Sequence, residues 1–526
     1  MGPYDVTNPR GPAAGGATYT SVVIIGSGFS GLAMAAKLDR AGIRDFVILE
    51  HADGVGGTWR DNTYPGCACD IPSPLYSYSF DQNSEWSHLF AGQPEILRYL
   101  ESFARRRNLE ARTQFRQRVV AASWDDEAQL WTVRTAGGAT FVAPFLVSAM
   151  GLLHKAKTPT IPGLTRFAGP AFHSAEWNHD VDLAGKRVAV IGTGASAIQF
   201  VPAIVDQVSS MAVFQRSAPW ILPKANRTFD ERDKRRLRRA PWLKWYRRYR
   251  LYWQHEGRAT TFTNVATVND TTVGYARAHL ARQVPDPDLR AMLTPDYALG
   301  CKRLLISSDY YPAVAQSHVE LVTDAISEVT ETAVVTAEGR SIDVDCIIFG
   351  TGFDAQNALS GVSIAGRNGV TLAEAWANGM HAYLGTTVRG FPNFFILCGP
   401  NTGLGHNSQV FMIERQVKYA IAAIKAASGR DAAIEVGQRA QDGFRHWIDK
   451  AMAATVWKAG GCTSWYLDPK TGKNTLLWPS TTIDYWKRTR RLARSDYDYT
   501  ANPAAALENL SSTTASDRDR AGRFLA

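Results

Sequence analysis

The chain has 526 residues, which is enough for two or three domains with ordinary hydrophobic cores. Apolar residues make up 45% of the chain and charged residues 20%, which is normal for a soluble globular protein. No apolar run approaches the roughly 20 residues that span a bilayer, so no transmembrane segment is predicted. The net charge of +9 comes largely from one segment, and nothing in the sequence argues for a nucleic-acid partner.

Cysteine usage and the start of the chain bear on the compartment. The six cysteines, at 67, 69, 301, 346, 398 and 462, are few for this length and show no disulfide framework. Cys67 and Cys69 are separated by one residue, which does not match a Cys-x-x-Cys redox motif. Residues 1–18 are rich in Gly, Pro and Ala and lack the basic-then-apolar layout of a secretory signal. We therefore expect a cytoplasmic protein with reduced thiols and a flexible N-terminal tail.

The first motif along the chain is a glycine turn. The apolar run 21–25 leads directly into Gly26-Ser27-Gly28-Phe29-Ser30-Gly31, and a helix-like stretch follows. A strand that runs into such glycines lets the backbone approach a pyrophosphate, whose charge then faces the amides of a helix N-terminus. A second strand, 46–49, ends in Glu50, which lies 22 residues after Gly28, where a carboxylate binds the ribose hydroxyls of an adenosine. This unit suits FAD or NAD.

A second unit of the same kind follows. The strand-like run 187–191 leads into Gly192-Thr193-Gly194-Ala195-Ser196-Ala197. The next apolar run, 211–215, ends in Arg216-Ser217, 24 residues after Gly192, where NAD enzymes place an acid. A fixed cation and a hydroxyl match a 2′-phosphate, although a solvent-facing arginine is the alternative. We therefore assign FAD to the first unit and NADPH to the second, with electrons passing between them.

A basic segment comes after the second unit. From Glu231 to Arg258, eleven Lys and Arg residues stand against three acids, a net charge of +8. Six aromatic residues are interleaved with them: Trp242, Trp245, Tyr246, Tyr249, Tyr252 and Trp253. The functional interpretations are contact with an anionic membrane surface, with nucleic acid, or with a phosphorylated cofactor. The structural alternative, which we favour, is a helical insertion with a solvated basic face and an aromatic face packed inward.

These observations predict an α/β fold with two Rossmann-like dinucleotide-binding domains, for FAD and NADPH, and a mainly helical insertion. An apolar run at 394–397 suggests that the chain returns to the first domain, and the residues beyond 495 are small and polar. The predicted boundaries are a flexible tail at 1–18, an FAD-binding domain at 19–155 and 386–495, an NADPH-binding domain at 156–222 and 316–385, a helical insertion at 223–315, and a flexible tail at 496–526.

Two longer motifs carry a resemblance to a known family. The first is Gly56-Gly57-Thr58-Trp59, Tyr64-Pro65-Gly66 and Asp70, and the second is Phe167-x-Gly169-x-x-x-His173-x-x-x-Trp177. The chain resembles the type I Baeyer–Villiger monooxygenases, which are class B flavoprotein monooxygenases, from about residue 19 to about residue 490. It departs from the family pattern at Asn178, where Pro or Asp is usual. Trp177 favours this family over relatives that oxygenate nitrogen.

The resemblance extends to Cys301-Lys302-Arg303. It implies that Lys302 reaches the NADPH phosphate and that Arg303 lies over the flavin. In the family, reduced FAD and oxygen give a flavin peroxide that attacks a ketone carbonyl. A permanent cation keeps that peroxide deprotonated and stabilises the oxyanion of addition. Asp70 is implied as the carboxylate that orients Arg303. Without the resemblance, a turn residue and a surface cation would be the simpler interpretations of the two.

Further candidate residues lie within these motifs or outside them. Thr58, Trp59, Tyr76 and Val119 are assigned to cofactor binding together with Asp70, and the loop 399–405 is expected near the flavin ring, with a plain turn as the alternative. Trp465 is a candidate for the substrate pocket, although a core tryptophan is equally compatible. We expect His173 and Trp177 to connect the nucleotide domains. No metal site is predicted.

The predicted function is an FAD-containing, NADPH-dependent Baeyer–Villiger monooxygenase that converts a ketone and O2 to an ester or lactone. One alternative is a flavin monooxygenase that oxygenates sulfur or nitrogen. Another is a flavoprotein that oxidises NADPH without oxygenation, and a third is a nucleotide-sensing or membrane-docking protein, which rests only on residues 231–258. The expected partners are a small-molecule ketone and O2.

Overall fold

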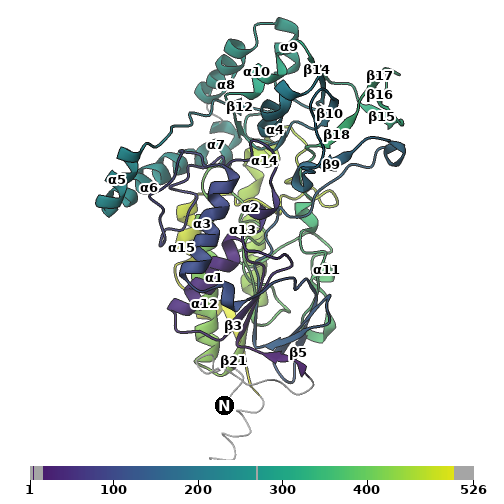
Figure 1. Ribbon diagram of the computed structural model, residues 1–526. Helices are drawn as coiled ribbons and strands as arrows, with labels where there is room; N and C mark the ends of the chain where they lie inside the picture. The colour runs from purple at the N-terminus through teal and green to yellow at the C-terminus, as the bar shows by residue number, and fades with distance from the viewer. Residues whose placement is uncertain (1–3, 5–15, 268–269, 503–526) are drawn as a thin grey trace, which may run out of the picture.

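The structure is a computed structural model that describes residue 4, residues 16–267 and residues 270–502. Figure 1 shows two parts along the long axis of the molecule, each with its own parallel sheet. The lower part contains α1 (Phe29–Arg40), α12 (Gln409–Ser428) and β3 (Phe46–Leu49). The upper part contains α4 (Ala197–Ile204), β10 (Arg187–Ile191) and β14 (Val319–Val322).

The lower sheet consists of parallel strands in the order β20-β8-β2-β3-β4. Its other strands are β20 (Phe394–Ile396), β8 (Phe145–Ser148), β2 (Val22–Ile25) and β4 (Thr113–Gln114). Every residue of β2, β8 and β20 is buried, because α1 packs on one face and a second sheet on the other. Since β20 pairs with β8, the chain returns to this sheet near its end.

The upper sheet is also entirely parallel, with the order β14-β11-β10-β18-β9. Its other strands are β11 (Ser210–Phe214), β18 (Cys346–Phe349) and β9 (Ala171–His173). The helices α4 and α10 (Tyr310–Val314) pack against each other beside it. The two sheets form the two α/β units that the glycine turns predict.

Smaller sheets extend both parts. A mixed sheet of the lower part has the order β1-β7-β6-β5-β19, and an antiparallel sheet of the upper part has the order β15-β16-β17. The strands are β1 (Thr18–Tyr19), β7 (Thr140–Ala143), β6 (Leu130–Thr135), β5 (Val119–Asp125), β19 (Ser363–Ala365), β15 (Ile326–Val329), β16 (Ala333–Thr336) and β17 (Ser341–Asp343). The mixed sheet is the one that covers the lower parallel sheet. Because β19 pairs with β5, the chain is back in the lower part by residue 363, so the predicted boundary at 386 is wrong.

The segment 223–315 is mainly helical, as expected. It contains α10 and also α5 (Glu231–Arg239), α6 (Pro241–Glu256), α7 (Ala259–Thr263), α8 (Asp270–Gln283) and α9 (Pro287–Met292). The strand β12 (Ile221–Leu222) pairs with β13 (Leu305–Ile306), so the insertion leaves and rejoins the upper part at one place, before the predicted limit at 315. The helix α10 therefore belongs to the upper part. The remaining helices are α2 (Thr58–Asp61), α3 (Gln93–Arg106), α11 (Leu372–Ala375), α13 (Gln438–Ala453), α14 (Val456–Ala459) and α15 (Thr482–Thr489). Within the described ranges, no helix has the length and apolar character needed to cross a membrane.

The orientation of α6 contradicts the expectation that its aromatic residues pack inward. The exposed side chains are Trp242, Trp245, Tyr246, Tyr249 and Trp253, and Trp242 is 68% exposed. The buried side of the helix is partly polar: Arg248 donates hydrogen bonds to the carbonyl oxygens of Pro74, Leu75 and Ser77. Helical periodicity reveals a stripe of aromatic residues, but it does not say which face of the helix the rest of the protein covers.

The C-terminal tail predicted from residue 496 is wrong over residues 497–501. These residues form β22 (Tyr497–Ala501), which pairs antiparallel with β21 (Ala432–Val436). Tyr497 is buried and donates a hydrogen bond to Tyr419 at 3.0 Å, so its aromatic ring holds the strand on the protein. Within the expected N-terminal tail, Tyr4 is buried and its hydroxyl lies 2.7 Å from Gln129 Oε1. The rest of these two predictions, at 1–3, 5–15 and 503–526, lies outside the described residues.

The prediction of reduced cysteines is wrong for one pair. Cys301 and Cys462 form a disulfide, although 161 residues separate them, and the other four cysteines are free. A separation of this size carries no spacing signal, because the fold brings the two segments together. Beside the disulfide, the amide of Ala298 donates to the carbonyl oxygen of Gly460 at 3.2 Å.

Candidate active site

The first glycine turn links β2 tightly to α1. Gly26 has a φ of +98°, which favours glycine, and a Cβ atom on Gly31 would lie 1.9 Å from the carbonyl oxygen of Gly26. The helix α1 follows Gly28, has no capping side chain and carries no acid in its first turn. The amides of Phe29, Ser30 and Gly31 are therefore suited to a phosphate group.

Glu50 lies at the end of β3 beside this turn, and its carboxylate is buried. Its Oε2 accepts hydrogen bonds from the amide and hydroxyl of Ser27 at 2.9 and 2.6 Å, and its Oε1 accepts one from the amide of Ala52 at 3.1 Å. Burial alone would raise the pKa of this carboxyl, but hydrogen bonds from His51, Ser27 and Ala52 outweigh burial and lower it to about 2. Glu50 is thus an anion that stabilises the glycine turn.

Trp59 and Tyr76 lie together beside the start of α1. Thr58 and Trp59 open α2 directly after Gly57, whose φ is +53°. The indole Nε1 of Trp59 donates to the hydroxyl of Tyr76 at 3.2 Å, and the Tyr76 ring meets that of Phe29 edge-on at 5.1 Å. The structure therefore brings these predicted residues into one aromatic cluster next to the first turn.

Three other predicted residues, Val119, His173 and Trp177, make contacts that hold parts of the fold together. Val119 begins β5 and is buried, and the amide of Gln117, two residues earlier, donates to the carbonyl oxygen of Glu50 at 2.8 Å. His173 ends β9 and accepts a hydrogen bond from a neighbouring backbone amide. Trp177 packs against a phenylalanine ring of α4 at 5.5 Å, and so joins the segment after β9 to that helix.

The second glycine turn links β10 to α4 in the same way. Gly192 has a φ of +104°, and a Cβ atom there would lie 2.6 Å from the carbonyl oxygen of Gly350. The helix α4 begins at Ala197, without a capping side chain and without an acid in its first turn. Residues 193–196 therefore present their backbone at an uncapped helix N-terminus, which fits a second pyrophosphate.

Three side chains gather next to this second turn. The Nζ atom of Lys302 lies 2.6 Å from Ser217 Oγ, and the hydroxyl of Thr193 lies 3.5 Å from the carbonyl oxygen of Ser217. Burial lowers the pKa of Lys302, and the positive charge of nearby Arg216 lowers it further. Two neighbouring cations and a hydroxyl form a site suited to a dianionic phosphate.

Arg303 and Asp70 meet, as the resemblance implies. The Nε atom of Arg303 donates to Asp70 Oδ2 at 3.2 Å, and its Nη2 atom contacts the same oxygen. The charge of Asp70 raises the pKa of Arg303. Burial would raise the pKa of Asp70, but the charge of Arg303 and its hydrogen bond lower it. Both groups are therefore charged, and both side chains are half-buried.

Two residues near this pair were not found by sequence analysis. Lys224 is close enough for its charge to lower the pKa of Asp70 as well, and burial lowers the pKa of Lys224 itself. The buried Tyr466 interacts with Arg303 and contributes to its raised pKa. Its neighbour Trp465, the candidate for the substrate pocket, is 43% exposed. Lys224 stands in no motif, and only its place in the fold reveals its role.

Lys302 and Arg303 are adjacent but face different units. Lys302 contacts Ser217, which follows β11 of the second unit, whereas Arg303 contacts Asp70, which follows the loop beside the first turn. This dipeptide therefore lies where the two dinucleotide units meet. Such a junction is where a nicotinamide would deliver a hydride to a flavin.

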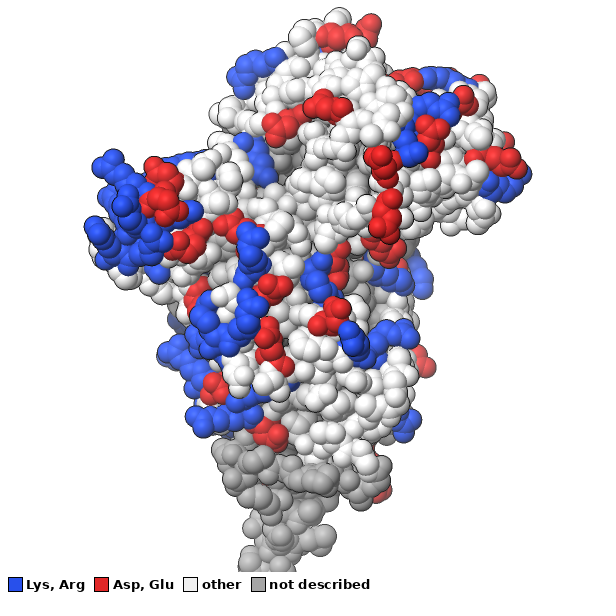
Figure 2. All heavy atoms as spheres, in the orientation of Figure 1, with Lys and Arg blue, Asp and Glu red and all other residues white. Residues whose placement is uncertain are grey.

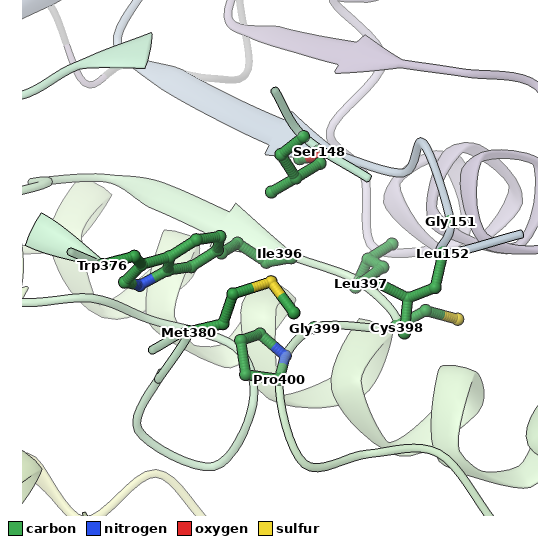
Figure 3. A pocket seen from close by; sticks show the side chains of 11 residues that line it. Ser148, Gly151, Leu152, Trp376, Met380, Ile396, Leu397, Cys398, Gly399 and Pro400 are labelled. Carbon is green, nitrogen blue, oxygen red and sulfur yellow. The ribbon is translucent and has the colours of Figure 1, made fainter. Parts of the chain in front are cut away.

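A small apolar pocket lies at the carboxyl edge of the lower sheet (Figure 3). The side chains of Trp376, Met380 and Pro400 gather on one side of it, and Ser148, at the end of β8, lies on the other. Gly399 and Pro400 come from the loop predicted near the flavin ring. Neither Asp70 nor Arg303 lines this pocket, so it is separate from the charged pair.

Comparison with known proteins identifies the family. Residues 23–237 match the family model described as pyridine nucleotide-disulphide oxidoreductase, a range that contains both glycine turns. A Baeyer–Villiger monooxygenase of Pseudomonas aeruginosa is 45% identical over 95% of this chain and 95% of its own length. A Baeyer–Villiger monooxygenase of Streptomyces coelicolor is 44% identical over 91% of this chain and 92% of its own length. The chain belongs to the Baeyer–Villiger monooxygenases.

Solved structures agree with this assignment. A steroid monooxygenase bound to NADP has a TM-score of 0.82 and 34% identity, and the match covers 92% of this chain and all of that one. A cyclohexanone monooxygenase from a Rhodococcus species, bound to NADP+, has a TM-score of 0.83 and 29% identity over the same shares. The predictions of the family, of the two-unit α/β fold and of FAD and NADPH as cofactors are confirmed. This Baeyer–Villiger monooxygenase is an NADPH- and FAD-dependent enzyme.

Proposed function

We propose that this Baeyer–Villiger monooxygenase inserts one oxygen atom of O2 beside the carbonyl carbon of a small-molecule ketone, and releases an ester or lactone. The observation that supports this most strongly is the ion pair between Arg303 and Asp70, because it places a permanent positive charge at the junction of the two dinucleotide units. Oxygenation of sulfur or nitrogen passes through no carbonyl oxyanion and does not need this charge.

The roles of the pair follow from the charge that develops during the reaction. Bound FAD, once reduced by NADPH, supplies the activated oxygen. As the ketone carbon becomes tetrahedral its oxygen gains negative charge, which the guanidinium of Arg303 stabilises. Asp70 remains a carboxylate because its pKa is lowered, and it holds the guanidinium in one orientation.

The cofactor sites use the two turns. We assign the FAD pyrophosphate to the amides at the start of α1, the ribose to Glu50, and the flavin to the surroundings of Thr58, Trp59 and Tyr76, with Val119 beside the Glu50 loop. The NADPH pyrophosphate is assigned to residues 192–196. Its 2′-phosphate is assigned to Arg216, Ser217 and Lys302, where two cations and a hydroxyl already lie together.

The domain boundaries belong to the same proposal. The FAD-binding domain would comprise 19–155 and a second part that contains β19, β20 and β22, and the NADPH-binding domain would comprise 156–222 and a second part that begins before β14. The helical insertion would begin at 223 and end before β13. The pairing of β19 with β5 and of β20 with β8 supports a return of the chain to the FAD-binding domain before residue 363. The pairing of β12 with β13 supports an insertion that begins at 223 and ends before 305. A cytoplasmic location is also proposed. The Cys301–Cys462 disulfide is the feature that would favour an oxidising compartment, so the thiol state of this pair in cells tests the location.

The direct test is a product assay with labelled oxygen. The purified holoenzyme is supplied with NADPH, 18O2 and either cyclohexanone, a steroid ketone or an organic sulfide, and the products are analysed by mass spectrometry. We expect an ester or lactone that carries one labelled oxygen atom. Formation of sulfoxide without any ester would instead identify a heteroatom oxygenase, and NADPH oxidation that yields only hydrogen peroxide would contradict oxygenation altogether.

A further inference from the structure

The first helix of the insertion, α5, has an unusual charged face. Arg232, Arg235, Arg236 and Arg239 follow the spacing i, i+3, i+4, i+7, so they lie on one side of the helix, and all four are exposed. We refer to them as the arginine face. The other charged residues of α5 have partners: Lys234 and Arg238 pair with Glu231, and Asp233 pairs with Arg227 and Arg247. None of these pairs includes a residue of the arginine face.

This arrangement is unfavourable for the helix by itself. Arg232 and Arg236, and likewise Arg235 and Arg239, stand four residues apart, a spacing at which like charges repel along a helix. Figure 2 shows Lys and Arg side chains gathered densely on the projection at the left of the molecule, where Figure 1 labels α5. An anionic surface that covered the arginine face would remove the repulsion, which a neutral or basic partner would not do.

The next helix, α6, presents apolar surface to solvent. Its exposed aromatic side chains are Trp242, Trp245, Tyr246, Tyr249 and Trp253, with exposed fractions from 45% to 68%. We refer to them as the aromatic face. A contiguous exposed apolar patch of this kind with a charged rim marks an interaction site. Only Ala240 separates α5 from α6, and the two helices contact each other, so the arginine face adjoins the helix that carries the aromatic face.

The opposite side of α6 fixes the helix on the protein. Arg248 is buried and donates to three backbone carbonyl oxygens, and Glu256 is buried and accepts from Asn407 at 2.8 Å and from Thr482 at 2.7 Å. The helix therefore cannot turn its aromatic face inward without breaking these buried polar contacts. Exposure of the aromatic face is a property of the folded protein.

We infer that the arginine face and the aromatic face together dock the enzyme on the surface of an anionic lipid bilayer. Tryptophan and tyrosine concentrate at the membrane–water interface, where the ring is buried and the polar atom stays hydrated, and arginine pairs with lipid phosphates. A two-fold contact with a second copy would bring two arginine faces together. A nucleic-acid duplex would contact the arginine face and leave the aromatic face in water. The inference does not depend on the substrate proposed above.

The test is sedimentation of the holoenzyme with vesicles. One set contains equal parts of phosphatidylcholine and phosphatidylglycerol, and the other contains phosphatidylcholine alone. We expect binding to the anionic vesicles that weakens as salt is added, and little binding to the neutral ones. Replacing the arginine face in the quadruple variant R232Q/R235Q/R236Q/R239Q is expected to lower the partition coefficient about a hundredfold or more. The triple variant W242S/W245S/Y249S should lose the binding that survives in high salt.

Matched controls separate this surface from general attraction of a basic protein. The variant R105Q/R118Q/R439Q/R491Q removes four exposed arginines elsewhere and should bind as the wild type does. Flavin content and melting temperature show that each variant is folded. The inference is overturned if the control loses binding as strongly as the α5 variant, or if anionic vesicles do not bind. It is also overturned if light scattering shows that α5 and α6 hold two copies of the chain together, or if the enzyme binds a DNA duplex through these helices but binds no vesicles.

Discussion

Arg303 donates a hydrogen bond to Asp70 across 233 residues of sequence, at an N···O distance of 3.2 Å. The residue before Arg303, Lys302, contacts Ser217 of the other dinucleotide unit. A short stretch of chain therefore contacts both units through neighbouring side chains. Any movement of this stretch would shift the guanidinium of Arg303 and the amine of Lys302 together.

We expect Arg303→Ala to lower ester formation by about 10²- to 10³-fold, the usual loss when a group that stabilises an oxyanion is removed. Reduction of the flavin by NADPH, followed anaerobically by its absorbance, should be largely retained, because Lys302 and the second turn are intact. Arg303→Lys keeps the charge but loses the planar guanidinium, so its rate of ester formation should fall between those of the wild type and of Arg303→Ala. Arg277→Ala, on the exposed side of α8, is the control. Undiminished ester formation in Arg303→Ala would refute the assigned role.

Asp70→Asn tests the orientation of the guanidinium separately from its charge. Asparagine has nearly the same shape but cannot form the charge-assisted hydrogen bond, whose loss costs about 1.5–3 kcal/mol and so about 10- to 100-fold in rate. We expect more of the NADPH to be oxidised without ester formation, which the ratio of ester to NADPH consumed measures. A ratio equal to that of the wild type would show that Asp70 does not orient Arg303.

Arg216→Ala and Lys302→Ala should each weaken the binding of NADPH about 10- to 100-fold, because each removes a charged group that we propose as a partner of the 2′-phosphate. NADH lacks this phosphate, so its affinity should change little. The measurement is the dissociation constant of each coenzyme for the oxidised holoenzyme. Equal losses for NADPH and NADH in both variants would mean that these side chains act on something other than the phosphate.

The glycine turns could be predicted from sequence because their requirement is local. A positive φ at Gly26 and Gly192, and the absence of room for a Cβ at Gly31, restrict these positions to glycine wherever they occur in a chain. The contact between Arg303 and Asp70 is different, because it depends on how two distant segments pack. The family resemblance supplied that pairing, and no local pattern could have done so.

The incorrect predictions also concern features that depend on how distant segments pack. The pattern of α6 shows its aromatic stripe, but burial of Arg248 against backbone carbonyls decides which side faces the protein. Tyr466 was missed in favour of Trp465, since adjacent aromatic residues look alike until the fold buries one of them. The position of β22 was missed because a strand is stabilised by its partner, β21, as much as by its own residues.

The lowered pKa of Glu50 predicts a pH-dependent contribution to stability. Relative to the ordinary value of 4.5, a pKa of about 2 corresponds to about 3 kcal/mol of stabilisation. Because the pKa is lowered in the folded state, this stabilisation is complete above pH 4.5 and is lost as the pH falls toward 2. Glu50→Gln should therefore lower the melting temperature of the holoenzyme most at neutral pH, and the difference from wild type should shrink below about pH 4.5. Glu127→Gln, at an exposed position, is the control, and a difference that stays constant with pH would contradict this account.

The disulfide between Cys301 and Cys462 closes a loop of 161 residues next to Lys302 and Arg303. Restricting so long a loop in the unfolded chain stabilises the folded protein by roughly 2–5 kcal/mol. We expect Cys462→Ser and reduction of the wild type with dithiothreitol to lower the melting temperature by the same amount, and dithiothreitol to have no further effect on the variant. Mass spectrometry of the alkylated protein reports the state of the bond. A reductant effect of equal size in Cys462→Ser would show that the stabilisation comes from another source.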